Sequence, residues 1–201
     1  MCHRFAADSA RRDPLAARRC TTPVRLLIAL LITGVAASPA GVSGPRVVGC
    51  STHVEAGGPR PTAREVREAR RNSVSVAHLT LWGMRLAGGR DFRPGLWKAG
   101  VTVRDYRPVT VRVARRDRRW VGLDYVQGRD ARRVADADPA VRFEPCPPGT
   151  HSFTHHDRLL GPETGWAGDF VVGRRGCATL FVRRRGTAHS VRVRIGFGAR
   201  C

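Results

Sequence analysis

A two-residue alternation of apolar and polar side chains is the feature that most constrains the fold of this chain. Val109, Val111 and Val113 alternate with Thr110 and Arg112, for example. Because successive side chains of a β-strand point to opposite faces, this pattern predicts antiparallel strands with one buried and one solvent-facing side. Similar runs, rich in β-branched residues and separated by Gly, Pro and Asp, lie at 74–82, 101–103, 109–113, 120–126, 141–143, 170–172, 178–183 and 191–195. Together they predict an all-β domain.

We expect this domain, over residues 73–201, to be an antiparallel two-sheet sandwich that is immunoglobulin-like in its general architecture. A small closed barrel is the alternative. Two hairpins follow from the spacing of the runs. The first joins 108–114 to 119–126 through an arginine-rich turn, and the second joins 177–184 to 188–196, where Gly186 can adopt a positive φ.

The N-terminal part of the sequence has the pattern of an export signal. Residues 1–25 are basic, and an apolar stretch with small residues at its end follows over 26–44. Such a segment predicts either a cleaved signal or a single transmembrane helix, with the basic flank in the cytoplasm. The expected partner of this segment is the membrane. The expected location of the β domain is therefore outside the cell, either anchored to the cell membrane or secreted.

Residues 45–72 are expected to be a linker that contains one short helix. The run Thr62-Ala63-Arg64-Glu65 has the spacing of a capping box, which predicts a helix over about 63–71. Within the same linker, Val47-Val48-Gly49-Cys50 resembles a bacterial lipobox, so Cys50 is a candidate for lipidation, although Pro45 and Arg46 depart from that pattern.

Six cysteines are present, and Cys146, Cys177 and Cys201 lie within the expected β domain. An oxidising compartment would favour a disulfide among them. We expect Cys146 to pair with Cys177, with Cys201 as the alternative partner. Such a bridge would stabilise the fold by about 3–4 kcal/mol on the loop-entropy model.

The charge is strongly positive, with 36 Lys plus Arg against 16 Asp plus Glu and a net charge of +20. Lys98 is the only lysine, which is typical of the codon usage of a high-GC genome and favours a simply solvated surface. The alternative is attraction to a polyanion. Candidate anion contacts lie at the two predicted hairpin tips: Arg115, Arg116, Arg118 and Arg119 at the first, and Arg183, Arg184 and Arg185 at the second. Nucleic acid is not an expected partner, because aromatic residues that could stack on bases do not interleave with these arginines.

Catalytic motifs are weak in this sequence. Cys146, His151, His155 and His156 are residue types that bind zinc, but no CxxC spacing fixes them and a polar loop explains them as well. No nucleophile elbow or phosphate-binding glycine loop is formed. We therefore predict no catalytic, cofactor-binding or metal-binding residues, and a protein that is not an enzyme.

Several short segments carry a resemblance to a known group: 97–99, 107–111, 141–146, 164–168, 176–177 and 197–201. In their order they resemble uncharacterised small exported or membrane-anchored β-domain proteins of high-GC Gram-positive bacteria. The resemblance implies export and a β fold, and it carries no catalytic residue with it.

The expected function is therefore that of a non-catalytic cell-surface or secreted module with a binding or structural role. One alternative is an extracellular hydrolase, which would need His, Asp and Ser side chains to converge in one pocket. The other is an electrostatic binder of an anionic cell-wall polymer or of lipid headgroups. Exposed arginines around a filled core would favour this second alternative.

Overall fold

The computed structural model describes residues 44–55, 62–155 and 157–201. The basic segment 1–25 and the expected export helix over 26–44, apart from Gly44, lie outside the described residues. Within the described part, none of the helices has the length and apolar character needed to cross a membrane. The described residues all belong to one compact unit.

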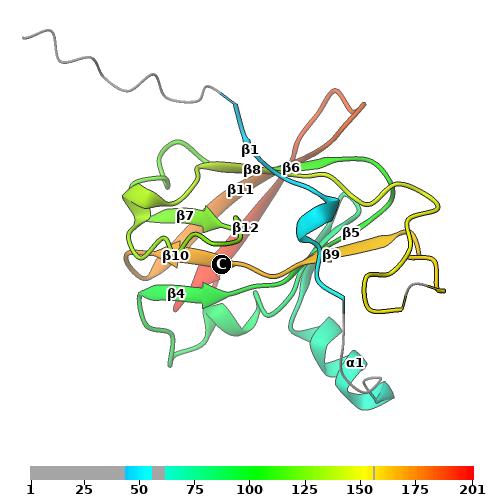
Figure 1. The fold of residues 1–201 in the computed structure, drawn as a ribbon. Helices are drawn as coiled ribbons and strands as arrows, with labels where there is room; N and C mark the ends of the chain where they lie inside the picture. The colour runs from blue at the N-terminus through cyan, green and yellow to red at the C-terminus, as the bar shows by residue number, and fades with distance from the viewer. Residues whose placement is uncertain (1–43, 56–61, 156) are drawn as a thin grey trace, which may run out of the picture. The chain divides into compact units, whose positions relative to one another are not determined.

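The largest sheet, sheet A, has five strands in the order β1 (Arg46–Val48), β8 (Ala140–Phe143), β6 (Val109–Val113), β11 (Gly176–Arg184) and β12 (Val191–Phe197) (Figure 1). The β1–β8 pair is parallel and the other pairs are antiparallel. β1 lies in the stretch that is expected to be a linker, so the domain begins before residue 73. A strand of only three residues gives too short an alternation to be recognised from sequence.

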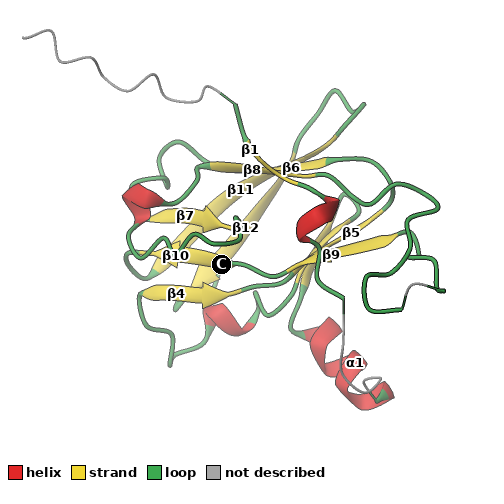
Figure 2. Ribbon diagram, viewed as in Figure 1, coloured by secondary structure: helices red, strands yellow, loops and turns green. Residues whose placement is uncertain are grey.

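Two further sheets lie outside sheet A. Sheet B has the order β2 (Val74–Val76), β3 (Leu79–Leu81), β5 (Val101–Arg104) and β9 (Glu163–Trp166). Sheet C has the order β4 (Gly95–Lys98), β10 (Asp169–Val172) and β7 (Val121–Asp124) (Figure 2). The fold is all-β, as predicted, but it is sandwich-like with three hydrogen-bonded sheets instead of two.

Sheets B and C are joined by one interrupted ladder. Lys98 lies opposite Asp169 and Val101 lies opposite Trp166, so both halves keep the same register. Between the halves, the amide of Ala99 donates to the carbonyl of Gly168 at 2.9 Å. A side chain at Gly168 would come within 2.2 Å of the Tyr125 ring, so this close approach requires glycine. Tyr125 therefore packs directly against the point where the ladder is broken.

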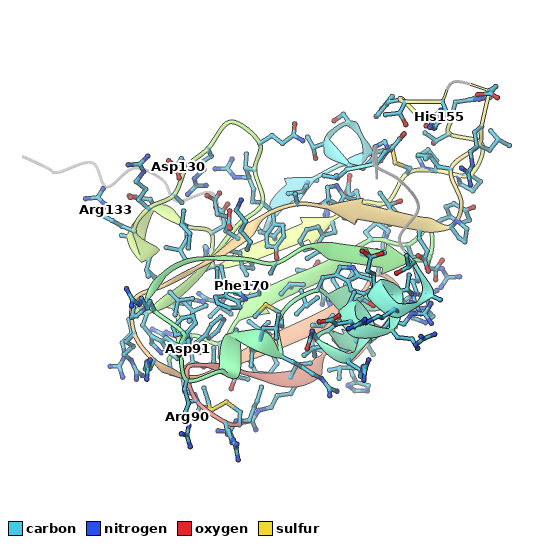
Figure 3. All side chains as sticks on the ribbon, turned by 90° about the horizontal axis from the view of Figure 1, so that it is seen from below. Arg90, Asp91, Asp130, Arg133, His155 and Phe170 are labelled. Atoms are coloured by element: carbon cyan, nitrogen blue, oxygen red, sulfur yellow. A yellow bond between two sulfur atoms is a disulfide. The ribbon has the colours of Figure 1, made fainter. Side chains whose placement is uncertain are left out.

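The core lies between sheet A and the other strands. Phe143 from β8, Phe170 from β10 and Phe197 from β12 are each fully buried, and the rings of Phe170 and Phe197 lie 5.6 Å apart. Figure 3 shows Phe170 in the interior, whereas Asp130 and Arg133 lie at the periphery. The valines of the alternating runs point inward as predicted; Val191, at the start of the edge strand β12, is an exception and is 47% exposed.

Of the two predicted hairpins, one forms and the other does not. β11 and β12 pair in antiparallel register, and Gly186 in their turn has a φ of +86°, so the second hairpin is confirmed. The first is wrong, because β6 belongs to sheet A whereas β7 pairs with β10 in sheet C. Each residue of β7 is buried, so both faces of this strand are covered.

The only α-helix in the described residues is α1 (Ala63–Arg71). Its capping box forms as predicted, since the Thr62 hydroxyl accepts from the Glu65 amide and the Glu65 carboxylate accepts from the Thr62 amide. Short 3₁₀ turns occur at η1 (Cys50–Thr52), η2 (Leu86–Gly88) and η3 (Val134–Asp136).

Two disulfides are formed, and neither is the expected Cys146–Cys177 pair or its alternative. Cys146 pairs with Cys50, and Cys177 pairs with Cys201. The parallel pairing of β1 with β8 explains the first bridge, because Cys50 and Cys146 follow the ends of these neighbouring strands. No local pattern in the sequence reveals this strand pairing, and the expected partner of Cys146 is therefore wrong.

The disulfide also decides between two chemical roles of Cys50. Its Sγ is bonded to Cys146, whereas lipidation of a lipobox cysteine requires a free thiol. The prediction of a lipidated Cys50 is therefore wrong for the disulfide-bonded protein.

Candidate functional site

The outer surface of sheet A carries a set of arginines that the strand register brings together. Because the valines of β6 and β11 point into the core, the residues between them point outward. One cross-strand row joins Arg142 of β8, Thr110 of β6 and Arg183 of β11. The next row joins Arg112 of β6, Phe181 of β11 and Arg192 of β12. We call Arg112, Arg142, Arg183, Arg192 and Arg194 the arginine face.

Most of these guanidinium groups have no anionic partner. Arg142 pairs with Glu144 at 2.6 Å. Among the described residues, Arg112, Arg183, Arg192 and Arg194 form no ion pair, although the sheet brings several of them into neighbouring positions. Apart from Arg142, the arginines of this face therefore carry positive charge that no ion pair within the described residues compensates.

A groove runs across this face. A cavity of about 540 Å³ is lined by Arg112, Arg142, Arg183, Arg184 and Arg185 together with Thr110. A neighbouring cavity of about 290 Å³ shares Thr110, Arg112 and Arg183 with it, and adds Phe181. The two cavities are therefore adjacent, and arginines line both of them.

Two of the arginines that line the groove have a donor that is buried without an acceptor. The Nε atoms of Arg142 and Arg184 are shielded from solvent and have no hydrogen-bond partner in the structure. One terminal nitrogen of each residue, Nη2, is paired with a carboxylate, that of Glu144 for Arg142 and that of Asp105 for Arg184. A buried donor without a partner costs free energy, so an anion that reached these Nε atoms would remove that cost.

The arginines predicted from the two hairpin tips have different roles. Arg183 and Arg185 line the groove, and Arg184 lines it while its guanidinium is held by Asp105. At the other tip, Arg116 donates to the hydroxyl of Thr179 and Arg118 donates to the carbonyl of Val113, so both help to fix their turn. Arg115 and Arg119 are exposed.

The register places these two tips at opposite ends of the β6–β11 pair, because Val113 lies opposite Leu180 and Val109 lies opposite Arg184. The arginine face lies between them. Its members Arg112, Arg142, Arg192 and Arg194 are not among the predicted contacts. The alternation places each of them on a solvent-facing side, but only the strand order brings them together.

The same register corrects one expectation about aromatic residues. Phe181 is 37% exposed and lies between Arg112 and Arg192, so one aromatic ring does interleave with the arginines. An exposed ring of this kind can contact an apolar part of a ligand while the neighbouring guanidinium groups bind its charges.

A second cluster, around Glu55, brings His and Ser together, as the hydrolase alternative requires. The Glu55 carboxylate accepts hydrogen bonds from Ser152 Oγ at 2.5 Å and from Thr154 Oγ1 at 2.6 Å, and it lies 2.9 Å from His53 Nε2. The hydrogen bond from Ser152, followed by that from Thr154, holds the pKa of Glu55 far below its ordinary value.

The order of these contacts does not match a nucleophile activated by a base. Ser152 donates to the carboxylate instead of to His53, and His53 Nδ1 lies 2.6 Å from the carbonyl oxygen of Cys50. A catalytic triad needs the serine bonded to the histidine and the histidine to the acid. The cluster instead ties residues 53–55 to the loop that contains Ser152.

The zinc ligands suggested by the sequence do not form a site. Cys146 Sγ is consumed by the disulfide with Cys50, and His156 lies outside the described residues. Within the described residues, the one group of ligand atoms close enough for a metal is Cys50, His53 and Cys146, which includes both sulfurs of that disulfide.

Comparison with protein-family models, with curated proteins and with solved structures finds no match for this chain. The function is therefore inferred from the chemistry of its own residues.

Proposed function

We propose that this chain is a non-catalytic, cell-surface or secreted module that binds an anionic polymer of the cell envelope along the arginine face. The observation that carries the proposal is the cavity on sheet A, which is lined by Arg112, Arg183 and Arg185 without ion-pair partners among the described residues. Two further lining arginines, Arg142 and Arg184, each have a buried Nε donor that lacks an acceptor in the structure. Guanidinium groups suit this task because each presents a planar set of donors that matches phosphate and carboxylate oxygens.

An extended polymer fits this surface better than a single small anion. The arginines occupy successive cross-strand rows, so their charges are spread along the sheet instead of converging on one point. Each row can contact a separate charged group of a chain that lies across it, and several weak contacts then add up to useful affinity.

The location outside the cytoplasm is part of the same proposal. Two disulfides within the described residues are typical of proteins that fold in an oxidising compartment. The basic and apolar segments over 1–25 and 26–44 support export of the domain. We further propose that sheets B and C act as one layer facing sheet A, which gives the two-layer, immunoglobulin-like arrangement.

Binding of the full-length protein to soluble polyphosphate, measured by isothermal titration calorimetry at about physiological salt, tests this function. The double variant Arg112→Gln, Arg183→Gln removes two charges from the groove. The matched control, Arg64→Gln, Arg67→Gln, removes two exposed charges from α1. We expect the groove variant to bind at least about tenfold more weakly, since each charge-assisted hydrogen bond contributes about 1.5–3 kcal/mol.

The control variant should bind within about twofold of the wild type. An equal loss in both double variants would contradict the proposal, because the binding would then reflect net charge alone. Vesicles of phosphatidylglycerol test the alternative of lipid headgroups. A groove-dependent affinity for these vesicles that exceeds the affinity for polyphosphate would move the proposed partner from a polymer to the membrane surface.

A further inference from the structure

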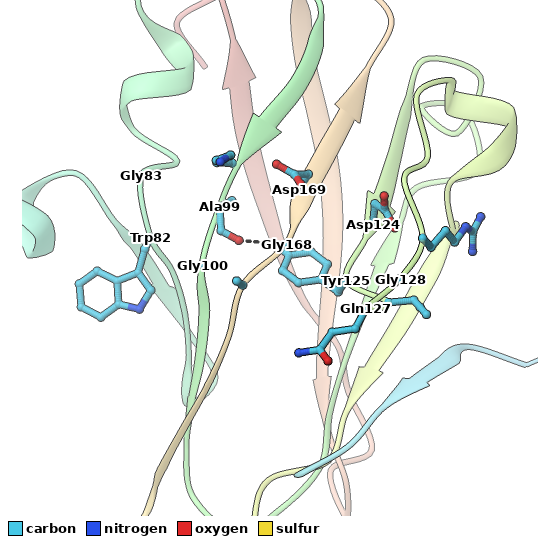
Figure 4. Close-up of a pocket in the computed structure, with 14 residues that line it drawn as sticks. Trp82, Gly83, Ala99, Gly100, Asp124, Tyr125, Gln127, Gly128, Gly168 and Asp169 are labelled. Atoms are coloured by element: carbon cyan, nitrogen blue, oxygen red, sulfur yellow. Dashed lines mark hydrogen bonds between the residues drawn. The ribbon is translucent and has the colours of Figure 1, made fainter. Parts of the chain in front are cut away.

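A second cavity lies away from the arginine face, at the break between sheets B and C. It measures about 530 Å³, and its lining includes Trp82, Lys98, Asp124, Tyr125, Gln127 and Asp169. The Tyr125 hydroxyl donates to the carbonyl of Ala99 at 2.8 Å and thereby fixes one wall (Figure 4). The break in the ladder therefore produces a cavity of the size that small organic ligands occupy.

Two carboxylates face this cavity from neighbouring strands. Asp169 of β10 lies directly opposite Asp124 of β7 in the antiparallel register. Residues in such positions have their Cβ atoms about 4.5–5.5 Å apart and on the same side of the sheet. Figure 4 shows both side chains on one side of Tyr125, whereas Trp82 lies apart from them among the lining residues.

Asp124 is buried without full hydrogen bonding. It is only 7% exposed, and its Oδ2 accepts from the Ala131 amide at 2.8 Å. Its Oδ1 is buried and has no partner, and the same is true of Asp169 Oδ1. An ionised carboxylate with a buried, unsatisfied oxygen is costly. This independent observation indicates that the carboxylate pair is built to receive a donor.

The neighbouring cations do not neutralise the pair by contact. Burial, followed by the negative charge of Asp124, raises the pKa of Asp169, and a more distant Asp130 acts in the same direction. Lys98 lies opposite Asp169 on β4 and opposes this shift, but the two residues form no ion pair in the described structure. Arg129 also lines the cavity, but its guanidinium is bound to Asp138 at 3.0 Å.

The chemistry of the cavity favours an organic cation over a metal ion. A metal site would need at least a third closely placed ligand, and no such acidic group occurs around Asp124 and Asp169 among the described residues. The cavity is also far larger than an ion requires, and Trp82, Tyr125 and Val126 give it apolar walls. An ammonium group can supply three donors to the two carboxylates.

We infer that this cavity binds a small organic amine whose ammonium group lies between Asp124 and Asp169 and whose body extends toward Trp82. This site is separate from the arginine face, and its occupancy does not depend on polyanion binding. The protein would thus recognise an amine and a polyanion on different strands.

Calorimetric titration of the full-length protein with benzylamine tests the inference, with benzyl alcohol as the uncharged probe of the same shape. We expect saturable binding of benzylamine and none of benzyl alcohol. Asp124→Asn and Asp169→Asn should each weaken benzylamine binding at least about tenfold. The control Asp91→Asn, which changes an exposed carboxylate outside the cavity, should bind within about twofold of the wild type.

Circular dichroism identifies variants that fold, and the partly exposed Asp169 provides a second test if Asp124→Asn does not fold. Absence of saturable benzylamine binding would overturn the inference, as would equal binding of benzyl alcohol. Benzylamine binding that is unchanged in both variants would also overturn it. Displacement of benzylamine by calcium chloride, in a manner that depends on Asp124, would show a metal site instead of an amine site.

Discussion

Glu55 is a single residue that connects two distant parts of the sequence. Its carboxylate accepts from Ser152 and Thr154, which lie almost one hundred residues further along the chain. His53, two residues away, packs against Phe153 with tilted rings whose centroids lie 4.7 Å apart. The segment that follows β1 is therefore held against the loop before β9 by hydrogen bonds and ring contact.

The lowered pKa of Glu55 makes this contact dependent on pH. Because the folded state favours the charged carboxylate, the contact stabilises the fold above the ordinary pKa of 4.5 and is lost as the pH falls through the lower folded value. We expect Glu55→Gln to lower the thermal midpoint at pH 7. The difference from the wild type should shrink below about pH 4.5. Thermal melts followed by circular dichroism across that range measure it, and a difference that is constant with pH would contradict this role.

At the scale of elements, the two disulfides close loops of very different length. Cys50–Cys146 closes a sequence separation of 96 residues, whereas Cys177–Cys201 closes only 24. A longer closed loop restricts the unfolded chain more and so stabilises the folded state more. Strain that the disulfide introduces into the folded state reduces this gain.

We therefore expect the Cys50→Ser, Cys146→Ser variant to lose about 4–5 kcal/mol of unfolding free energy and the Cys177→Ser, Cys201→Ser variant about 3.5 kcal/mol. Chemical denaturation measures both losses. Peptide mapping without reductant identifies the bridges, and a Cys146–Cys177 peptide would show that the Cys50–Cys146 and Cys177–Cys201 pairing is incorrect.

The elements also show what the sequence can and cannot predict. The alternation of Val109 to Val113 correctly predicts a strand, and the capping box correctly predicts α1. Strand pairing is harder to predict from the sequence, as β6 and β7 show: they are close in sequence and yet belong to different sheets. Local patterns specify which face of a strand is buried, but not which strand lies beside it.

The candidate sites can be predicted from sequence only to the same extent, because they too depend on which strands are neighbours. Arg185 can be identified from an arginine-rich turn, since a turn is exposed whatever its neighbours are. Arg183 lies just before that turn in β11, where the alternation places it on the exposed side. Arg112 and Arg192 become part of a site only through the order β6–β11–β12. The Asp124–Asp169 pair depends on a register between residues that lie far apart in the sequence, and no local signal marks it.

At the scale of the whole molecule, a net charge of +20 attracts every polyanion to some extent. The proposed function requires more than this general attraction, because it assigns the binding to a particular face of sheet A. Exposed arginines elsewhere, such as those of α1, contribute long-range attraction that salt screens. Direct contacts in the groove should instead displace counterions from the polymer in a fixed number.

Salt dependence separates these two contributions. The affinity for polyphosphate should fall with increasing salt, and the slope of its logarithm against the logarithm of salt concentration reports the number of charge contacts. Arg112→Gln, Arg183→Gln should reduce this slope by roughly two, because about one counterion is released per contact. The α1 control, Arg64→Gln, Arg67→Gln, should leave the slope unchanged.

This comparison of slopes is the most direct measurement of whether the outer surface of sheet A is the binding surface. A smaller slope in the groove variant alone is the predicted result. Identical slopes in the wild type and in both variants would contradict it, since the arginines of β6 and β11 would then make no contact with the polymer.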